Sequence, residues 1–249
     1  MNPTFRAPYR RSLGLDIRTG VLLLLIFGVA RVALVLQANV TGSYQVVGAI
    51  FALMIALPWV LLTPEGRRQI GLVAPRWRWL PPALVAGLAS AGLVYVVAFL
   101  CWGNTIENPF AYIALSYSAV PSPLDEPQRL MFFLIFAGIG MTFSPLGEEI
   151  LYRGLAHESL TPRLGDRGAA LVDAGAFAVV HLAHFGIVYL AGAWTFLPVP
   201  ALLWLVAMFL VSLLFFSFRK LSGSLWGAIL AHAGFNLGMN ALIFFVILR

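Results

Sequence analysis

The segment LPPALVAGLASAGLVYVVAFLCW, residues 80–102, has no charged side chain along its whole length. A helix crosses the hydrocarbon core of a bilayer with roughly 20 apolar residues, so this segment predicts a transmembrane helix. The rest of the chain has the same character, because 61% of its 249 residues are hydrophobic and only 10% are charged. Soluble domains carry about a quarter charged residues. The composition therefore excludes a soluble globular domain, a disordered chain and a nucleic-acid-binding module.

Seven apolar segments are expected to cross the membrane. They are Val21–Gln37, Tyr44–Leu62, Leu80–Trp102, Leu130–Gly147, Ala169–Leu190, Pro198–Phe218 and Leu225–Leu248. We predict an all-α polytopic bundle that forms one integrated membrane domain. Residues 1–129 would supply a three-span region and residues 130–249 a four-span catalytic core. The single cysteine, Cys101, excludes an intrachain disulfide and a thiolate metal cage.

Basic residues predict the orientation of these spans. Twelve of the 16 fall in segments on one side of the bundle: Arg6, Arg10, Arg11, Arg18, Arg67, Arg68, Arg76, Arg78, Arg163, Arg167, Arg219 and Lys220. Loops rich in Lys and Arg stay in the cytoplasm, so the N-terminus is expected there. All but one of the 16 are arginine, which indicates a GC-rich, prokaryotic genome. We therefore expect a multi-pass protein of a prokaryotic cell membrane.

Charged residues inside the apolar segments point to function. The fourth segment ends in SPLGEEILYRG, residues 144–154, which contains Glu148, Glu149 and Arg153. Unpaired at the centre of a bilayer, the three together would cost on the order of 7–10 kcal/mol. Such residues face a bundle interior or a wet cavity and mark functional sites. Pro145 should kink or restart this helix, and Thr161-Pro162 should end it near Leu160.

Helical spacing predicts how these side chains are arranged. Glu149 and Arg153 lie at i and i+4 and should form an ion pair, whereas Glu148 points about 100° away and should remain free for chemistry. Phe177 and His181 share one helix face, and so do His232 and Asn236. At about 1.5 Å per residue, Glu148, His181 and His232 lie at similar depths. A carboxylate, two imidazoles and an amide in one dry site suit water activation and oxyanion stabilisation.

Other polar and small residues receive more modest interpretations. His184 is expected to pack or to contact substrate. Arg31 is expected to snorkel or pair, and Asp173 to lie near the cytoplasmic end of its span, neither as a candidate for chemistry. His157 and Glu158 are interpreted as interfacial surface, and Gly234 with Gly238 as a small-residue face for close helix packing.

The ordered motifs resemble a known family. Glu148-Glu149-x-x-x-Arg153, Phe177-x-x-x-His181 and His232-x-x-x-Asn236 are similar to the CAAX protease and bacteriocin-processing family, which includes the type II CAAX prenyl protease. The resemblance covers about residues 130–248. It implies a conical bundle open to the cytoplasm and the membrane. In such a site Glu148 with His181 would activate water, and His232 with Asn236 would hold the tetrahedral oxyanion.

The cofactor requirement has two interpretations. One carboxylate and two histidines could complete the three protein ligands of a hydrolytic zinc ion. Asn236 is better suited to hydrogen bonding than to zinc, so a metal-independent, glutamate-based mechanism is favoured and zinc stays an alternative. The expected partners are membrane lipid and a peptide or membrane-protein substrate, with no nucleic acid.

Two rival functions use the same residues differently. A non-catalytic binding protein of the bacteriocin-immunity or chaperone type would need the polar cluster only for structure. A small proton-coupled transporter would use Glu148 and the histidines as a relay. The absence of inverted repeats and of paired broken helices in the sequence disfavours the transporter. The leading hypothesis is an intramembrane endopeptidase that acts on a membrane-associated or lipid-modified peptide.

Overall fold

Helices make up most of the chain, as a computed structural model of residues 4–117, 120–121 and 123–249 shows. The helices are α1 (Ile17–Thr41), α2 (Gln45–Leu61), α3 (Pro64–Gln69), α4 (Leu80–Trp102), α5 (Pro109–Leu115), α6 (Glu126–Glu149), α7 (His157–Val180), α8 (Pro198–Ser222) and α9 (Leu225–Leu242). Short 3₁₀ turns, η1 (Trp77–Trp79) and η3 (His181–Ala183), and π-helical segments, η2 (Ile150–Ala156) and η4 (Ile243–Ile247), extend them. The strands β1 (Ile187–Leu190) and β2 (Ala193–Phe196) form one small hairpin.

The all-α polytopic architecture is confirmed. In the described part of the chain, five helical segments are long and apolar enough to cross a membrane: Ile17–Thr41, Trp77–Trp102, Glu126–Ala183, Pro198–Ser222 and Leu225–Ile247. Val46–Leu61 is a shorter apolar helix. The 58-residue segment Glu126–Ala183 includes two of the predicted spans. The count of seven spans, the orientation and the division at residue 130 stay predictions.

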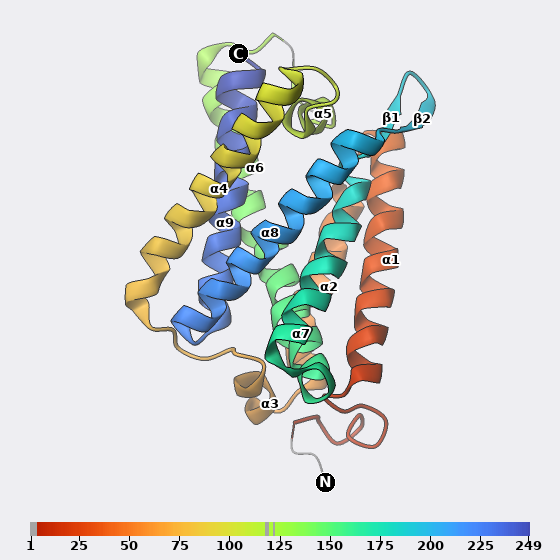
Figure 1. Cartoon of the computed structure of the whole chain (residues 1–249), viewed down its shortest axis with the longest axis vertical. Helices are drawn as coiled ribbons and strands as arrows, with labels where there is room; N and C mark the ends of the chain where they lie inside the picture. The colour runs from red at the N-terminus through yellow and green to blue at the C-terminus, as the bar shows by residue number, and fades with distance from the viewer. Residues whose placement is uncertain (1–3, 118–119, 122) are drawn as a thin grey trace.

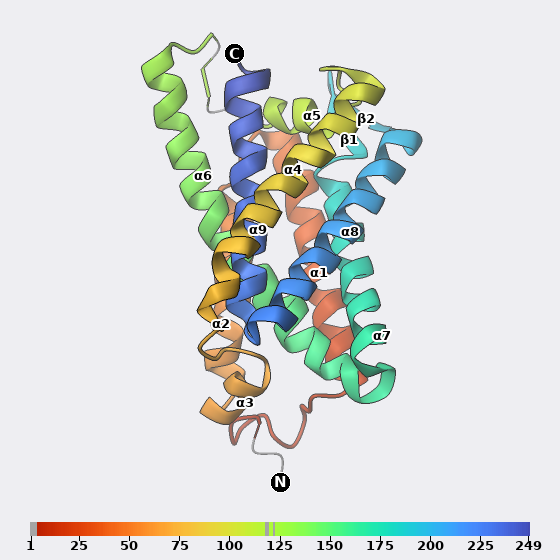
Figure 2. The same ribbon diagram turned by 60° about the vertical axis from the view of Figure 1, so that its left-hand side comes forward.

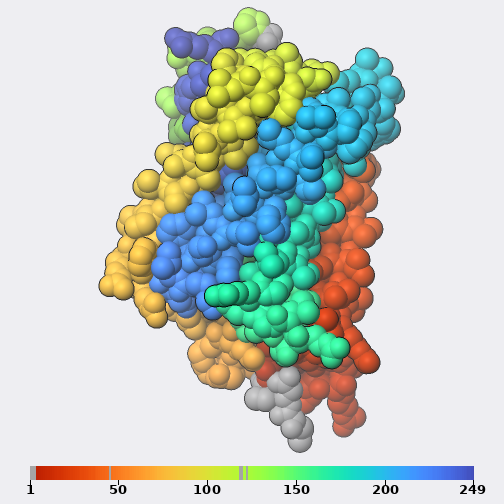
Figure 3. Space-filling view, viewed as in Figure 1, coloured from red at the N-terminus to blue at the C-terminus, as the bar shows by residue number. Residues whose placement is uncertain are grey.

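Helix α9 occupies the middle of the bundle, with α4 and α8 crossing in front of it and α6 beside it (Figure 1). Helix α1 packs against α7, and α2 against α6. The N-terminal segment and α3 lie at one end of the molecule, while α5, the hairpin and the C-terminus lie at the other (Figures 1 and 2). On the face shown in Figure 3, α8 runs diagonally between α4 and α7.

Glycines allow α4 and α9 to approach each other closely. A Cβ atom on Gly234 would lie 2.2 Å from the carbonyl oxygen of Leu84, and one on Gly87 would lie 1.8 Å from that of Ala231. A Cβ on Gly238 would meet the Cβ of Ala91 at 2.9 Å. The predicted small-residue face of α9 is therefore confirmed, since any side chain at these positions would force the helices apart.

We expect Gly234→Ala to lower the stability of the bundle by about 1–3 kcal/mol, because overpacking a close contact displaces backbone or side chains. Gly92→Ala on α4 is the matched control, since a Cβ there meets nothing within 4 Å. Thermal unfolding of the purified protein in detergent would measure both. Equal midpoints for the two variants would contradict the close contact.

The long segment from α6 to α7 differs from the sequence-based expectation at Pro162, where the helix was expected to end. Helix α6 continues through Pro145 without a break, and α7 continues through Pro162. Prolines are tolerated in membrane helices because local π adjustments and neighbouring helices satisfy the freed backbone groups, and π-helical η2 follows five residues after Pro145. The chain instead reverses at Gly165, whose φ of 69° is readily adopted only by glycine.

The predicted fifth span, Ala169–Leu190, is wrong at its end. Helix α7 stops at Val180, and residues after η3 form the hairpin, in which Ile187 pairs with Phe196 and Leu190 with Ala193. Ala191 and Gly192 both have positive φ, 49° and 82°, as a type I′ hairpin turn requires. Strand β1, with the sequence IVYL, is as apolar as a membrane helix, so hydropathy alone did not separate it from the span.

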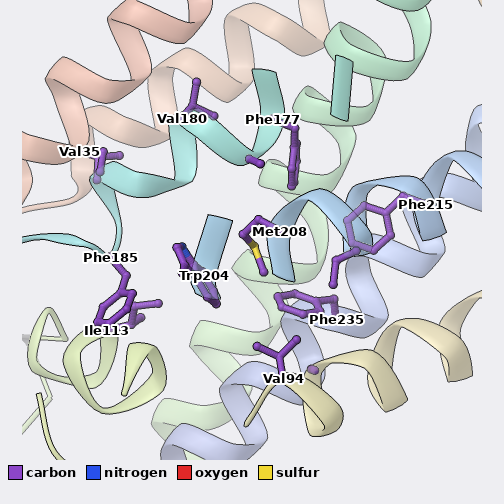
Figure 4. Close-up of a cluster of buried hydrophobic side chains, with 14 of the residues drawn as sticks. Val35, Val94, Ile113, Phe177, Val180, Phe185, Trp204, Met208, Phe215 and Phe235 are labelled. Carbon is purple, nitrogen blue, oxygen red and sulfur yellow. The ribbon is translucent and has the colours of Figure 1, made fainter. Parts of the chain in front are cut away.

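Buried aromatic side chains surround the place where α7, α8 and α9 meet. Figure 4 shows Phe177, Met208, Phe215 and Phe235 gathered between these helices. Phe177 and Phe215 are each 1% exposed, and their rings meet edge to face with centroids 6.2 Å apart. This cluster forms an apolar wall beside the buried polar residues described next.

Candidate active site

The predicted polar residues converge at the C-terminal end of α6. Glu148 and Glu149 are the last residues of α6 and are fully buried. His232 of α9 lies between them: its Nδ1 is 2.8 Å from Oε1 of Glu149 and its Nε2 is 3.7 Å from Oε2 of Glu148. The π-helical segment η2 begins immediately after these two residues, and π-helical segments often occur at functional sites.

Glu149 has the structural partner expected from its spacing. Oε2 of Glu149 lies 3.2 Å from Nε of Arg153. Arg153 also contacts the carbonyl oxygen of Ser212 at 3.2 Å, and its guanidinium lies 4.5 Å from the centroid of the Phe177 ring. Both charged side chains are completely buried. Glu149 therefore forms an ion pair with a guanidinium on one side and accepts a hydrogen bond from His232 on the other.

Glu148 is not free, which corrects the sequence-based expectation. It forms a buried ion pair with Arg31, which projects from α1. Nη2 of Arg31 also lies 3.2 Å from Nε2 of His181 and 3.3 Å from Nε2 of His184. The position of Arg31 as a lone charge in an apolar helix indicated that it has an ion-pair partner. Sequence alone did not reveal which residue it faced, because relative helix rotation is set by packing.

Nε2 of His181 faces the guanidinium of Arg31. The sequence-based expectation was that His181 would instead share a water molecule with Glu148. Its Nδ1 donates to the carbonyl oxygen of Phe177 at 2.6 Å, and the two rings lie 4.2 Å apart. With Nδ1 protonated, Nε2 of the neutral ring accepts from Arg31. Phe177 forms the wall beside this histidine, as its spacing predicted, and His184 stacks on Tyr44 at 6.5 Å.

Asn236 lies one turn beyond His232 on α9. Its Nδ2 donates to the carbonyl oxygen of Gly140 at 2.7 Å, which ties α9 to α6. Its backbone carbonyl accepts from Nδ2 of Asn240 at 2.8 Å, and Oδ1 of Asn240 accepts from the hydroxyl of Tyr117 at 3.0 Å. One of the two amide hydrogens of Asn236 is thus used in a hydrogen bond within the protein.

An apolar cavity of about 670 Å³ adjoins these residues. Arg31, His181, His232 and Asn236 line it, whereas Glu148 does not. The rest of its wall comes from α2, α5 and the residues after it, α6, α7, α8 and α9, and includes Val47, Phe51, Ile113, Tyr117, Phe136, Ile139, Gly140, Phe143, Phe177, Trp204, Met208, Phe215 and Phe235. A pocket of this size and character suits a largely apolar ligand.

The cavity extends toward the end of the bundle that carries α5 and the hairpin. Gly42 and Tyr44, which follow α1, and Ser116, which follows α5, belong to its lining. The phenol of Tyr44 donates to Oδ1 of Asn39. The N-terminal segment and α3 lie at the opposite end (Figure 1).

His157 lies inside the protein, contrary to its interpretation as interfacial surface. It is 1% exposed, and its Nδ1 and Nε2 lie 2.9 Å from Asp173 and 3.3 Å from Asp166. Its neighbour Glu158 pairs with Arg219 at 2.6 Å. The His157–Asp173 contact joins residues before and after the reversal at Gly165. Sequence separation concealed this contact, because no helical spacing relates the two residues.

The residues present do not form the zinc site considered above. Among residues 4–117, 120–121 and 123–249, no group of three His, Cys, Asp or Glu side chains is arranged to hold a metal ion. The guanidinium of Arg31 contacts both Glu148 and His181, and a cation between these two residues would oppose a second one. No step below therefore uses a metal.

Comparison with known proteins yields one match. Residues 129–238 match the family model described as type II CAAX prenyl endopeptidase Rce1-like. The family resemblance is confirmed. This matched region covers rather less than half of the chain and contains all six predicted site residues, but not Arg31. No curated protein and no solved structure was found to match the chain. The match supports a multi-pass intramembrane endopeptidase of the CAAX type as the general class.

Proposed function

We propose that this protein hydrolyses peptide bonds of a membrane-associated or lipid-modified substrate, with water activated by Glu148 and a histidine. The observation that carries the proposal is the placement of His232 between two buried carboxylates. A water about 2.8 Å from each partner can bridge Oε2 of Glu148 and Nε2 of His232, which are 3.7 Å apart. The geometry thus favours His232, rather than His181, as the imidazole that works with Glu148.

The proposed step transfers one proton and forms one bond. The bridging water attacks the scissile carbonyl carbon while its proton moves to the Glu148–His232 pair. Glu149 accepts a hydrogen bond from Nδ1 of His232, so it holds the ring in one tautomer and stabilises the imidazolium that develops. Collapse of the tetrahedral intermediate breaks the C–N bond, and the stored proton passes to the leaving amine. A histidine base oriented by a carboxylate is a recurrent hydrolytic arrangement.

The proposed substrate approaches through the bilayer. Ile139 and Phe143 of α6 line the cavity and are 56% and 49% exposed on the surface of the protein, and a Cβ atom on Gly48 of α2 would have nothing within 4 Å. A lipid-attached peptide could therefore pass between α2 and α6. If the basic end faces the cytoplasm, the cavity extends away from it, so lateral access suits the geometry better than access from the cytoplasmic loops. The cytoplasmic opening stays a prediction.

Comparative membrane proteomics of cells with the wild type and with Glu148→Gln tests the function. Glutamine keeps the size of the side chain but cannot accept the proton, so at least one membrane-associated precursor should accumulate and its product should disappear. A variant protein of normal abundance with an unchanged proteome and an unchanged phenotype would favour the non-catalytic binding protein.

A chelator provides the test of metal dependence. We expect peptide hydrolysis by the purified protein to be unchanged, within about twofold, after EDTA treatment and dialysis, because the site lacks a metal-binding ligand set. Full loss of activity, with recovery on adding zinc, would contradict the metal-independent mechanism.

A further inference from the structure

Arg31 brings a formal charge to the wall of the apolar cavity. Among the described residues that line this cavity, it is the only Asp, Glu, Lys or Arg. Its side chain is 3% exposed, so its charge is poorly screened by water. An uncommon cation facing a dry apolar space would attract an oxygen that carries negative charge.

The Arg31 guanidinium has more donors than protein acceptors. Its five N–H groups face Glu148, His181 and His184, and the hydroxyl of Tyr152 also lies near it. Among the described residues, Nε of Arg31 has no hydrogen-bond partner, and Nη1 meets Glu148 as an ion pair without hydrogen-bond geometry. A buried donor without a partner is costly, and this one belongs to a side chain that lines the cavity.

Its partners also fix the guanidinium in place. Glu148 comes from α6, while His181 and His184 lie at the end of α7. The ring of Phe51 from α2 lies 5.6 Å from the guanidinium carbon. A donor that is held rigidly before substrate arrives stabilises developing charge without reorganisation.

The groups first expected to hold the oxyanion have little donor capacity to spare. Nδ1 of His232 donates to Glu149, so Nε2 of the neutral ring carries no proton, and in the charged ring Nε2 faces Glu148. One amide hydrogen of Asn236 is bound to Gly140. A second hydrogen remains on Asn236, which leaves the site short of donors for a full negative charge.

We propose that Arg31 is a further catalytic residue, a cationic oxyanion-binding group that α1 supplies to the site. As the water oxygen bonds to the scissile carbonyl carbon, the carbonyl π electrons move to its oxygen. Arg31 donates to that oxyanion, with Asn236 as a second donor. When the intermediate collapses, the electron pair of the oxyanion re-forms the carbonyl bond, and the C–N bond pair leaves with the amine nitrogen, which takes the proton stored on the Glu148–His232 pair. The products are a carboxylic acid and an amine. No oxidant or cofactor enters the step.

A binding experiment tests this role without requiring hydrolysis. Decylphosphonate, which carries an anionic tetrahedral head on an apolar tail, is titrated into the full-length protein in lipid nanodiscs, with decanol as the uncharged control. At a hundredfold excess over its Kd, the phosphonate should raise the Tm by about 5–10 °C. Glu148→Gln should bind it more tightly, because Arg31 is released from its ion pair.

The binding should depend on Arg31 alone among the buried arginines. The double variant Arg31→Gln/Glu148→Gln, which avoids an unpaired buried charge, should lose the shift. Arg219→Gln, which removes a buried cation far from the cavity lining, should keep it. Equal shifts with decanol, or an equal shift in the double variant, would overturn the proposal.

The kinetic experiment rests on the proposed peptidase function and identifies the oxygen that Arg31 binds. Arg31→Lys keeps a cation for Glu148 but loses the planar fork, so kcat should fall about 10²-fold or more while KM changes little. Each substrate peptide is tested as a free acid and as a C-terminal amide. A rise in KM confined to the free acids would mean that Arg31 binds the terminal carboxylate, which contradicts the catalytic role. An inactive wild type would refute the peptidase, and the phosphonate titration would still decide the role of Arg31.

Discussion

Replacing His232 by alanine should lower kcat for peptide hydrolysis by about 10²–10⁴-fold, the range over which a positioned general base contributes. Removal of the ring takes away both the acceptor near Glu148 and the group that Glu149 orients. His181→Ala should cost less, because Nε2 of His181 faces the guanidinium of Arg31 and Nδ1 is bound to the carbonyl oxygen of Phe177. Initial rates with a fluorogenic peptide in nanodiscs would give both ratios.

His184→Ala provides the control for a general effect of removing an imidazole. His184 contacts Arg31 and lines the same cavity, but it touches neither carboxylate in the described contacts. We expect its kcat to fall less than tenfold. A larger loss for His181→Ala than for His232→Ala would restore the sequence-based assignment, in which Glu148 works with His181.

Hydropathy and helical spacing were sufficient to predict most of the bundle and the convergence of several candidate site residues. Leu80–Trp102 coincides with α4, and the spans at α8 and α9 begin at the predicted residues. Glu148, Glu149 and His232 were expected to lie close together because their helices place them at similar depths in the membrane. These predictions depend on features along one helix, where rise and rotation per residue are fixed.

The sequence failed where the answer depended on contacts between elements or on short-range backbone geometry. Arg31 and Glu148 lie on different helices, and no spacing rule relates their rotations. His157 and Asp173 meet only because the chain reverses at Gly165. Strand β1 was assigned to the fifth span, since a strand of four apolar residues has the same hydropathy as part of a membrane helix.

Removing the carboxylate of Glu149 should have the largest effect on folding. Glu149→Ala leaves Arg153 as a fully buried cation without its ion-pair partner and leaves Nδ1 of His232 without an acceptor. Breaking one side of a buried pair costs about 3–5 kcal/mol, because the remaining charge stays desolvated. The change should appear as a fall in the thermal unfolding midpoint in nanodiscs, together with lost activity.

Two matched variants distinguish the effect of breaking a buried ion pair from the effect of removing a charge. Glu65→Ala breaks an ion pair with Arg68 in which both side chains are 59% exposed, and exposed pairs contribute only about 0–1 kcal/mol. The double variant Glu149→Leu/Arg153→Met removes both buried charges, so it should recover part of the stability lost in Glu149→Ala while peptide hydrolysis stays low, because His232 is no longer oriented. If Glu149→Ala were as stable as Glu65→Ala, the carboxylate would have to be reached by water. That result would contradict the premise of the proposed mechanism that the site is dry and preorganised.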